Sequence, residues 1–256
     1  MNNGLIGYTG LVGSILKKKF DFNFFFNSKN ISQIKGKQFD LIVCAGANAE
    51  KWKANKYPKK DKENILYLIE SLKKIKCKKF ILISTVDVFK IPNNVYENTL
   101  IDENCLNAYG YNRRLLEKFI EKNFKNRIIV RLPALVGPGL KKNIVFDFHN
   151  QHNINQIDSR HFFQFYPLDN LWKDIKIFLN TKIKLIHLTA EPVQVAEVAK
   201  VFSIKNFKNH VSSNVLNYNF KSKYSKKYFN KKFYNYSKKE SLRAIKKFKM
   251  EEKKKI

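Results

Sequence analysis

Three things are scarce in this sequence of 256 residues: cysteine, acidic side chains and long apolar runs. The three cysteines, Cys44, Cys77 and Cys105, lie far apart and form no Cys-x-x-Cys pair, which favours plain thiols in a reducing compartment. No apolar run approaches the roughly 20 residues that span a bilayer. The first apolar strand starts almost at Met1, with no signal peptide before it. We therefore expect a cytoplasmic protein without a membrane segment.

The shortage of acidic residues gives a strongly basic chain, with 50 Lys and Arg, 21 Asp and Glu, and a formal net charge of +29. Such a charge fits a surface for nucleic acid, an anionic membrane or anionic ligands. It also fits compositional drift, because Lys, Asn, Ile and Phe are abundant throughout. The excess is spread widely, which favours drift combined with a preference for anionic ligands.

The basic residues are densest at the C-terminus, where residues 221–256 hold 15 Lys or Arg and 3 Glu. A tail rich in Lys and Tyr is able to contact nucleic acid by charge and stacking. The pair Ser237 and Glu240, however, has the spacing of a capping box at the start of a helix. We therefore expect a solvated terminal helix with a loose end, and we do not expect nucleic acid as a partner.

Two common kinds of site are missing from the sequence. It has no Gly-Lys-Ser/Thr phosphate loop, which argues against ATP hydrolysis of that type. His149 and His152 have a helical spacing, but no third ligand accompanies them, so we expect no metal site.

What the sequence does contain is an alternation of short apolar runs and amphipathic segments. Strands are predicted over 4–6, 22–26, 39–44, 80–84 and 127–132, and helices over 11–20, 61–74 and 107–123. The continuous apolar run 41–44 is typical of a strand covered on both faces. This order predicts an α/β protein, a Rossmann-fold doubly wound parallel sheet with a small C-terminal substrate-binding lobe.

The pattern loosens after Gly137-Pro138-Gly139. Helices are predicted over 143–149, 171–180 and 193–202, with a strand over 184–188. We therefore expect a dinucleotide-binding core over residues 1–140. Residues 141–256 would be a mixed region that completes the core, forms the small lobe and ends in the basic tail.

The first strand and the first helix are joined by a glycine loop with the spacing Gly7-x-x-Gly10-x-x-Gly13. Gly7 allows a tight turn, Gly10 lets a pyrophosphate approach the backbone, and Gly13 lets the helix pack close to the strand. The helix N-terminus then offers N–H groups and a positive dipole end. The loop predicts a dinucleotide phosphate site, completed by Thr9, Leu11 and Val12.

The residues that follow the second and third strands bear on the choice of cofactor. No carboxylate ends the second strand, where NAD-binding proteins hold the adenosine ribose. Ser28 and Lys29 stand there instead, and they suit a 2′-phosphate or simply a solvated turn. The small residues Ala45 and Gly46 end the third strand and let a cofactor lie against the backbone. The predicted cofactor is NAD or NADP.

Three residues in the middle of the chain suggest acid–base chemistry. Thr85 follows the fourth strand, and Tyr109 and Arg113 lie four residues apart on one helix face. A cation beside a phenol favours the phenolate, so we expect Arg113 to lower the pKa of Tyr109 toward that of a general base. The Thr85 hydroxyl would hold the substrate oxygen.

With these residues the chain resembles the NAD-dependent epimerase/dehydratase family of the extended short-chain dehydrogenase/reductase superfamily. The likeness runs through Gly7-x-x-Gly10-x-x-Gly13, Ser84-Thr85-x-x-Val88-Phe89, Tyr109-x-x-x-Arg113, Arg131-Leu132-Pro133 and Glu191-Pro192-Val193. It implies that Tyr109 is the catalytic base or acid at a sugar hydroxyl, that Thr85 assists it, and that Pro133 lies at the cofactor. It also implies a nucleotide-sugar substrate, a role in polysaccharide synthesis and a homodimer.

The resemblance has two departures. Arg113 stands where the family has a lysine that binds the nicotinamide ribose, and arginine keeps the charge without the compact ammonium. The lobe is also short for a nucleotide-sugar pocket; Asn143 is expected to contact the substrate, and Tyr166 either contacts it or belongs to the core. Two functions remain open: an epimerase, dehydratase or reductase, and a catalytically impaired dinucleotide sensor or scaffold.

Overall fold

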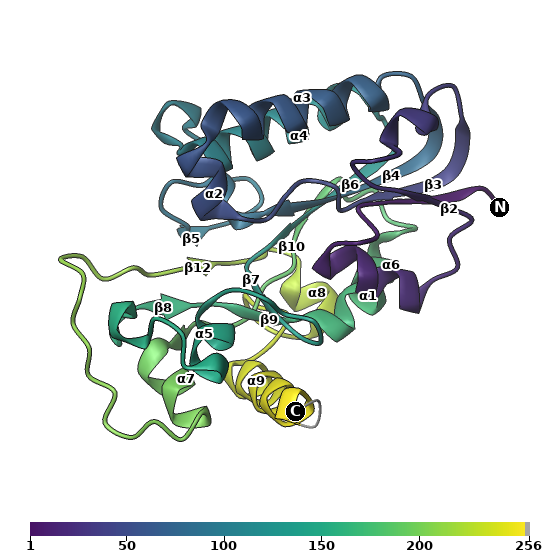
Figure 1. Ribbon diagram of the computed structural model, residues 1–256. Coiled ribbons are helices and arrows are strands. Elements are labelled where there is room, and N and C mark those ends of the chain that lie inside the picture. Colours follow the sequence, from purple (N-terminus) through teal and green to yellow (C-terminus); the bar gives the residue numbers. More distant parts are fainter. Residues whose placement is uncertain (254–256) are drawn as a thin grey trace. The chain divides into compact units, whose positions relative to one another are not determined.

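The computed structural model describes residues 1–253, and the chain divides into two compact units. Unit 1 comprises Met1–Lys90, Thr99–Arg131 and Trp172–Ile186. Unit 2 comprises Ile91–Asn98, Leu132–Leu171 and the chain from His187 onward. Neither unit is continuous in sequence, and each is described by itself (Figure 1). The domain boundary expected at residue 140 stays a prediction.

The centre of unit 1 is a six-stranded sheet. Its strands follow the order β10 (Leu185–His187), β6 (Arg127–Leu132), β4 (Lys76–Thr85), β3 (Gln38–Cys44), β1 (Asn3–Ile6) and β2 (Phe24–Phe26). β1 pairs in parallel with both β2 and β3, and β3 pairs in parallel with β4. Successive residues Ile42, Val43 and Cys44 are completely buried, as expected of a strand covered on both faces.

Helices cover this sheet on both sides. α3 (Pro58–Leu72) and α4 (Ala108–Asn123) pack together on one face, and α1 (Leu11–Lys19) and α6 (Leu171–Phe178) lie on the other (Figure 1). The predicted α/β class and doubly wound parallel sheet are therefore confirmed. One short helix, α2 (Lys51–Lys56), was not expected from the sequence.

The strand order changes direction at β1. The chain goes from β1 to β2 on one side and then places β3 on the other side. Only one strand lies outside β1, because residues 27–37 contain a single short 3-10 turn, Ile31–Ile34, which leaves no length for another helix and strand. In open α/β sheets, ligands bind beyond the carboxyl ends of the strands at such a point.

Up to residue 253, unit 2 contains three small strand pairs and four α-helices. The pairs are β7 (Ala134–Val136) with β9 (Phe165–Pro167), β8 (Phe162–Phe163) with β11 (Val193–Gln194), and β5 (Asn93–Val95) with β12 (Asn219–Phe220). The helices are α5 (Ile144–Asn150), α7 (Val195–Val201), α8 (Ser225–Phe229) and α9 (Lys238–Lys253).

The basic C-terminal segment is a packed part of unit 2. The predicted capping box is confirmed, since the Ser237 N–H donates to Glu240 Oε2 at 2.7 Å. Ile245 and Phe248 are buried, and the Ser241 hydroxyl donates to the Phe165 carbonyl of β9 at 2.8 Å. The expectation of a merely solvated helix is therefore wrong, because one face of α9 belongs to the core. Residues 254–256 of the expected tail lie outside the described residues.

Within residues 1–253, no helix combines the length and the apolar character that crossing a bilayer requires.

Candidate active site

Two glycines of the loop after β1 are required by packing. Gly7 has a φ of 82°, in the region that favours glycine, and a Cβ there would overlap the backbone of Ala45. A Cβ on Gly13 would overlap the Gly7 carbonyl. The loop is therefore pressed against the end of β3 on one side and against α1 on the other.

Gly10 is different from its two neighbours in the motif. Its φ of −78° and ψ of 170° are open to any residue, and it is the exposed N-cap of α1. An added Cβ would meet only the Gly7 carbonyl oxygen, at an ordinary contact distance of 3.4 Å. The fold does not need glycine at this position. Its missing side chain leaves the α1 N-terminus open to a ligand, as a pyrophosphate requires.

The other residues predicted to hold the cofactor lie around this loop. Leu11 and Val12 form the first turn of α1, Thr9 is exposed, and Ala45 and Gly46 follow β3 directly beside Gly7. Ser28 and Lys29 form an exposed turn after β2, where the Lys29 N–H donates to Asn27 Oδ1 at 2.9 Å. The structure thus places the glycine loop after β1 beside Ala45 and Gly46 after β3.

Thr85 and Tyr109 are brought together by the close approach of α4 to the end of β4. Asn107 caps α4 by accepting from the Gly110 N–H at 3.0 Å, and a Cβ on Gly110 would overlap the Asp87 carbonyl. Tyr109 therefore lies against the segment that follows Thr85, and Thr85 is near enough to the phenol to lower its pKa. The glycine at position 110 is the reason that the helix comes so near.

The environment of Tyr109 corrects the expected direction of its pKa. Burial raises the pKa, since only 7% of the residue is exposed, and the carboxylate of Asp87 raises it further. Arg113, Thr85 and Lys51 lower it, but they do not outweigh burial. The expected lowered pKa is wrong for this structure: the phenol is held in its protonated form.

Arg113 lies over the ring of Tyr109 and is tied to Asp61. Its guanidinium lies over the Tyr109 ring, with Cζ 4.0 Å from the ring centroid, and forms a two-point ion pair with Asp61 in which Nη2 and Oδ1 are 2.9 Å apart. Nη2 also donates to the Asn48 carbonyl. Arg113 and Asp61 are both buried, so the positive charge is largely neutralised. Of the three guanidinium nitrogen atoms of Arg113, only Nε is buried without a hydrogen-bond acceptor among residues 1–253.

Three further charged residues, Lys51, Asp87 and Asp61, lie at this site and were not predicted from the sequence. Lys51, at the start of α2, places Nζ 2.6 Å from Asp87 Oδ1. Asp87 Oδ2 lies 3.3 Å from the Thr85 hydroxyl, which in turn accepts from the Asp87 N–H at 3.1 Å. Lys51 gives no sequence signal, because lysine is everywhere in this chain. Asp61 does give one: it shares the buried face of α3 with Ile65.

Ser84, next to Thr85, belongs to a second polar cluster. Its hydroxyl donates to Glu117 Oε1 at 2.6 Å, and Arg131 pairs with both oxygens of Glu117, at 2.9 and 2.7 Å. The Glu117 side chain has no exposed surface, and that of Arg131 is 2% exposed. Burial alone would raise the pKa of Glu117, but the charge and hydrogen bonds of Arg131 hold it below its ordinary value.

Three residues predicted for this site lie in unit 2. Asn143 caps α5 by accepting from the Val145 N–H at 2.9 Å, and it donates to the Leu135 carbonyl at 3.0 Å. Tyr166 is completely buried in β9 and meets Tyr236 edge-on, so it is a core residue of unit 2. Pro133 is buried between β6 and β7.

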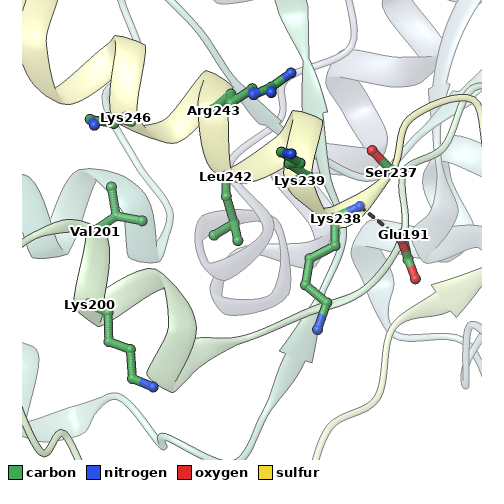
Figure 2. Close-up of a pocket in the computed structure, with 9 residues that line it drawn as sticks. All are labelled: Glu191, Lys200, Val201, Ser237, Lys238, Lys239, Leu242, Arg243 and Lys246. Atoms are coloured by element: carbon green, nitrogen blue, oxygen red, sulfur yellow. Dashed lines mark hydrogen bonds between the residues drawn. The ribbon is translucent and has the colours of Figure 1, made fainter.

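Unit 2 also contains a basic groove of about 710 Å³ between α7 and α9. Its lining includes Lys200, Lys239, Arg243 and Lys246, with one acidic residue, Glu191, whose carboxylate accepts from the Lys238 N–H at 2.9 Å. Figure 2 shows that Lys200, Arg243 and Lys246 point in different directions. Side chains that diverge in this way do not form a built anion site.

Comparisons with known proteins identify the fold. No family model matches the chain, and no curated protein matches its sequence. Among solved structures, it is similar to dTDP-4-dehydrorhamnose reductase from Bacillus anthracis in complex with NADP (17% identity, TM-score 0.72, covering 98% of this chain and 100% of that one). It is also similar to UDP-glucose 4-epimerase from Thermotoga maritima with UDP-glucose (13%, 0.69, 98% and 99%).

A third similar structure is dTDP-glucose 4,6-dehydratase from Bacillus anthracis in complex with NAD (12% identity, TM-score 0.67, covering 99% of this chain and 98% of that one). The three structures are matched over almost their whole length, at identities that establish the fold alone. The chain therefore has the fold of these nucleotide-binding sugar enzymes.

Proposed function

We propose that this chain is an NAD(P)-dependent enzyme that acts on a nucleotide-sugar, as an epimerase, a dehydratase or a reductase. One observation carries the proposal: Tyr109 of α4 is brought beside Thr85 at the carboxyl end of β4. The glycine loop lies at the same edge of the parallel sheet, with Gly10 open to a ligand. An acid–base pair beside a phosphate cradle is the arrangement that sugar oxidoreduction requires.

The structure offers a fit for the nicotinamide nucleotide. The open backbone at Gly10 suits the pyrophosphate, and Ala45 and Gly46 suit the chain of the cofactor beside it. The buried Nε of Arg113 is a donor with no acceptor among the described residues, as a site for a ribose hydroxyl would have. Ser28 and Lys29 suit a 2′-phosphate, which favours NADP. The bound nicotinamide would supply hydride exchange.

The residues of the chain itself supply the proton. A tyrosine whose pKa is raised is a proton donor at neutral pH, so Tyr109 gives its proton to the oxygen of a substrate carbonyl whose carbon would receive the hydride. Thr85 orients that hydroxyl. This direction favours reduction of a keto-sugar among the three reactions.

A sensor or scaffold that binds the dinucleotide without turnover is the second candidate. The ion pair of Arg113 with Asp61 favours it, because the buried carboxylate offsets the positive charge beside Tyr109. Arg113→Lys discriminates between the two candidates. A gain in hydride transfer indicates a half-retained active site, whereas no response together with tight cofactor binding favours the sensor.

The proposal is tested by cofactor binding and turnover in purified protein. Mass spectrometry of co-purified ligands and NADPH fluorescence measure binding, and UDP-glucose and dTDP-glucose with NAD or NADP, together with dTDP-4-dehydro-6-deoxy sugars with NADPH, serve as the substrate panel. We expect Gly10→Val to abolish nucleotide binding at unchanged melting temperature, and Tyr109→Phe to abolish turnover while sparing binding.

Gly13→Ala is the matched control for Gly10→Val. It is expected to lower the melting temperature, because its Cβ has no room against the Gly7 carbonyl. Nucleotide binding that survives Gly10→Val contradicts the cradle, and turnover that survives Tyr109→Phe contradicts the catalytic assignment.

A further inference from the structure

Tyr109 needs a route to solvent if it is to act more than once. After it donates its proton it is a phenolate, and the residue is only 7% exposed. Arg113, the charged group over its ring, does not supply a proton, because guanidinium does not deprotonate in proteins. Its four terminal N–H groups are also committed to Asp61 and to the carbonyls of Asn48 and Tyr109.

A series of neighbouring polar groups leads from Tyr109 in another direction. Thr85 lies close enough to the Tyr109 phenol to lower its pKa, the Thr85 hydroxyl donates to Asp87 Oδ2 at 3.3 Å, and Asp87 Oδ1 lies 2.6 Å from Lys51 Nζ. Exposure rises along the series: the Asp87 side chain is 17% exposed and the Lys51 side chain 38%. The buried phenol of Tyr109 and the partly exposed ammonium of Lys51 are thus the two ends of this series, which lies within unit 1.

We propose that the series Tyr109–Thr85–Asp87–Lys51 is the route by which the Tyr109 hydroxyl exchanges protons with solvent. The inference rests on the proposed function, in which Tyr109 is the proton donor. It gives Asp87 and Lys51 a role that neither the motif nor the fold assigns to them. They are relay residues, and they act on the substrate through Thr85 and Tyr109.

The steps balance in the reductive direction. A bound reduced nicotinamide would supply the hydride to the substrate carbonyl carbon, and the carbonyl oxygen takes the Tyr109 proton. The Lys51 ammonium then protonates the Asp87 carboxylate, the protonated Asp87 passes a proton to Thr85 as the Thr85 hydroxyl gives its own to the phenolate, and Lys51 takes a proton from water. Each protein group ends as it began, with one solvent proton consumed for each alcohol formed.

The first test requires no substrate. The whole chain is labelled with [ζ-¹³C]tyrosine, the Tyr109 resonance is identified by its loss in Tyr109→Phe, and its titration is followed by NMR. The charged groups that act on Tyr109 are Arg113, Asp87 and Lys51. We expect Asp87→Asn to lower the Tyr109 pKa by about one unit and Lys51→Met to raise it.

A matched control comes from the same unit, where Lys78 and Asp40 form an exposed pair at 2.7 Å. Asp40→Asn and Lys78→Met are expected to leave the Tyr109 titration unchanged. A Tyr109 pKa that does not move in Asp87→Asn overturns the relay, whether or not the protein binds a nicotinamide nucleotide.

The second test measures single-turnover hydride transfer at 340 nm, with the sugar nucleotide that the wild type converts, over a range of pH and in D₂O. We expect Asp87→Ala to slow turnover about tenfold or more at unchanged NADPH binding, and added formate or imidazole to restore part of the rate. Wild type should not respond to these buffers.

The outcomes separate the two proposals. If Tyr109→Phe is inactive and Asp87→Ala runs at the wild-type rate, the proposed function stands and the relay is overturned. If Tyr109→Phe remains active, the proposed function fails, and the NMR titration still decides whether Asp87 and Tyr109 are linked.

Discussion

Ser84 and Thr85 are neighbours at the end of β4, yet they belong to two polar clusters of opposite character. Ser84 joins Glu117 and Arg131, whose side chains are at most 2% exposed, in a cluster that the 17% exposed Arg114 borders by its ion pair with Glu117. Thr85 joins Tyr109, Asp87 and Lys51, whose exposure rises toward solvent. Successive residues of a strand point to opposite faces, so one strand end serves both. We expect the closed cluster to contribute mainly to stability and the open one to the proposed proton transfer.

Of the variants that test this difference, the one that removes Glu117 from the closed cluster should have the largest effect on stability. Glu117→Ala leaves the Arg131 charge buried without its carboxylate, and we expect a loss of about 3–5 kcal/mol in the free energy of unfolding. Urea denaturation measures it. Glu121→Ala, on the same helix, is the control: the Glu121 side chain is 32% exposed and its partner Arg114 keeps its ion pair with Glu117, so the loss should stay below about 1 kcal/mol. Equal losses would contradict the distinction.

The pair of Asp61 and Arg113 combines the two characters, because it is buried and also touches Tyr109. We expect Asp61→Asn to cost about 3 kcal/mol, since Arg113 keeps the carbonyls of Asn48 and Tyr109. We also expect the Tyr109 pKa to fall in the ¹³C titration, because the Arg113 charge is no longer neutralised. A Tyr109 pKa that stays unchanged would mean that Asp61 does not mask Arg113.

The same comparison shows what the sequence is able to predict. The glycine spacing, the apolar strands and the Thr85–Tyr109 pair depend on local patterns, and the structure has these features where they were expected. Neither the direction of the Tyr109 pKa nor the partners of Arg113 follow from a pattern. Burial and a contact with Asp61, 52 residues away in sequence, decide them. Only the position of the acidic Asp61 on the apolar face of α3 indicated such a buried contact in the sequence.

The basic C-terminal segment of unit 2 also shows what a sequence pattern leaves undetermined. Its basic composition indicated a solvated helix, whereas Ile245 and Phe248 carry a buried stripe that ties α9 into the core. Charge dominates the composition of the segment, and the spacing of its few apolar residues decides its packing.

Acid titration distinguishes the closed cluster by the sign of its effect. The pKa of Glu117 is lower in the folded chain than its ordinary value. Its contribution to stability is therefore fully present above the pKa of an unfolded glutamate, and it is lost as the pH falls through the folded pKa. Glu117→Gln should show a shallower fall in unfolding free energy below about pH 4.5 than wild type. A parallel fall in both proteins would contradict the pairing.

The smallest effect on stability is expected at the open end of the other cluster. Lys51→Met removes an ion pair whose lysine side chain is 38% exposed, so the unfolding free energy should change by less than about 1 kcal/mol. The same variant should raise the Tyr109 pKa, because one of the positive charges that favour its phenolate is gone. A residue that matters to the titration of a buried phenol and hardly to stability belongs to the chemistry of the site. A large loss of stability with an unchanged Tyr109 titration would place Lys51 in the scaffold instead.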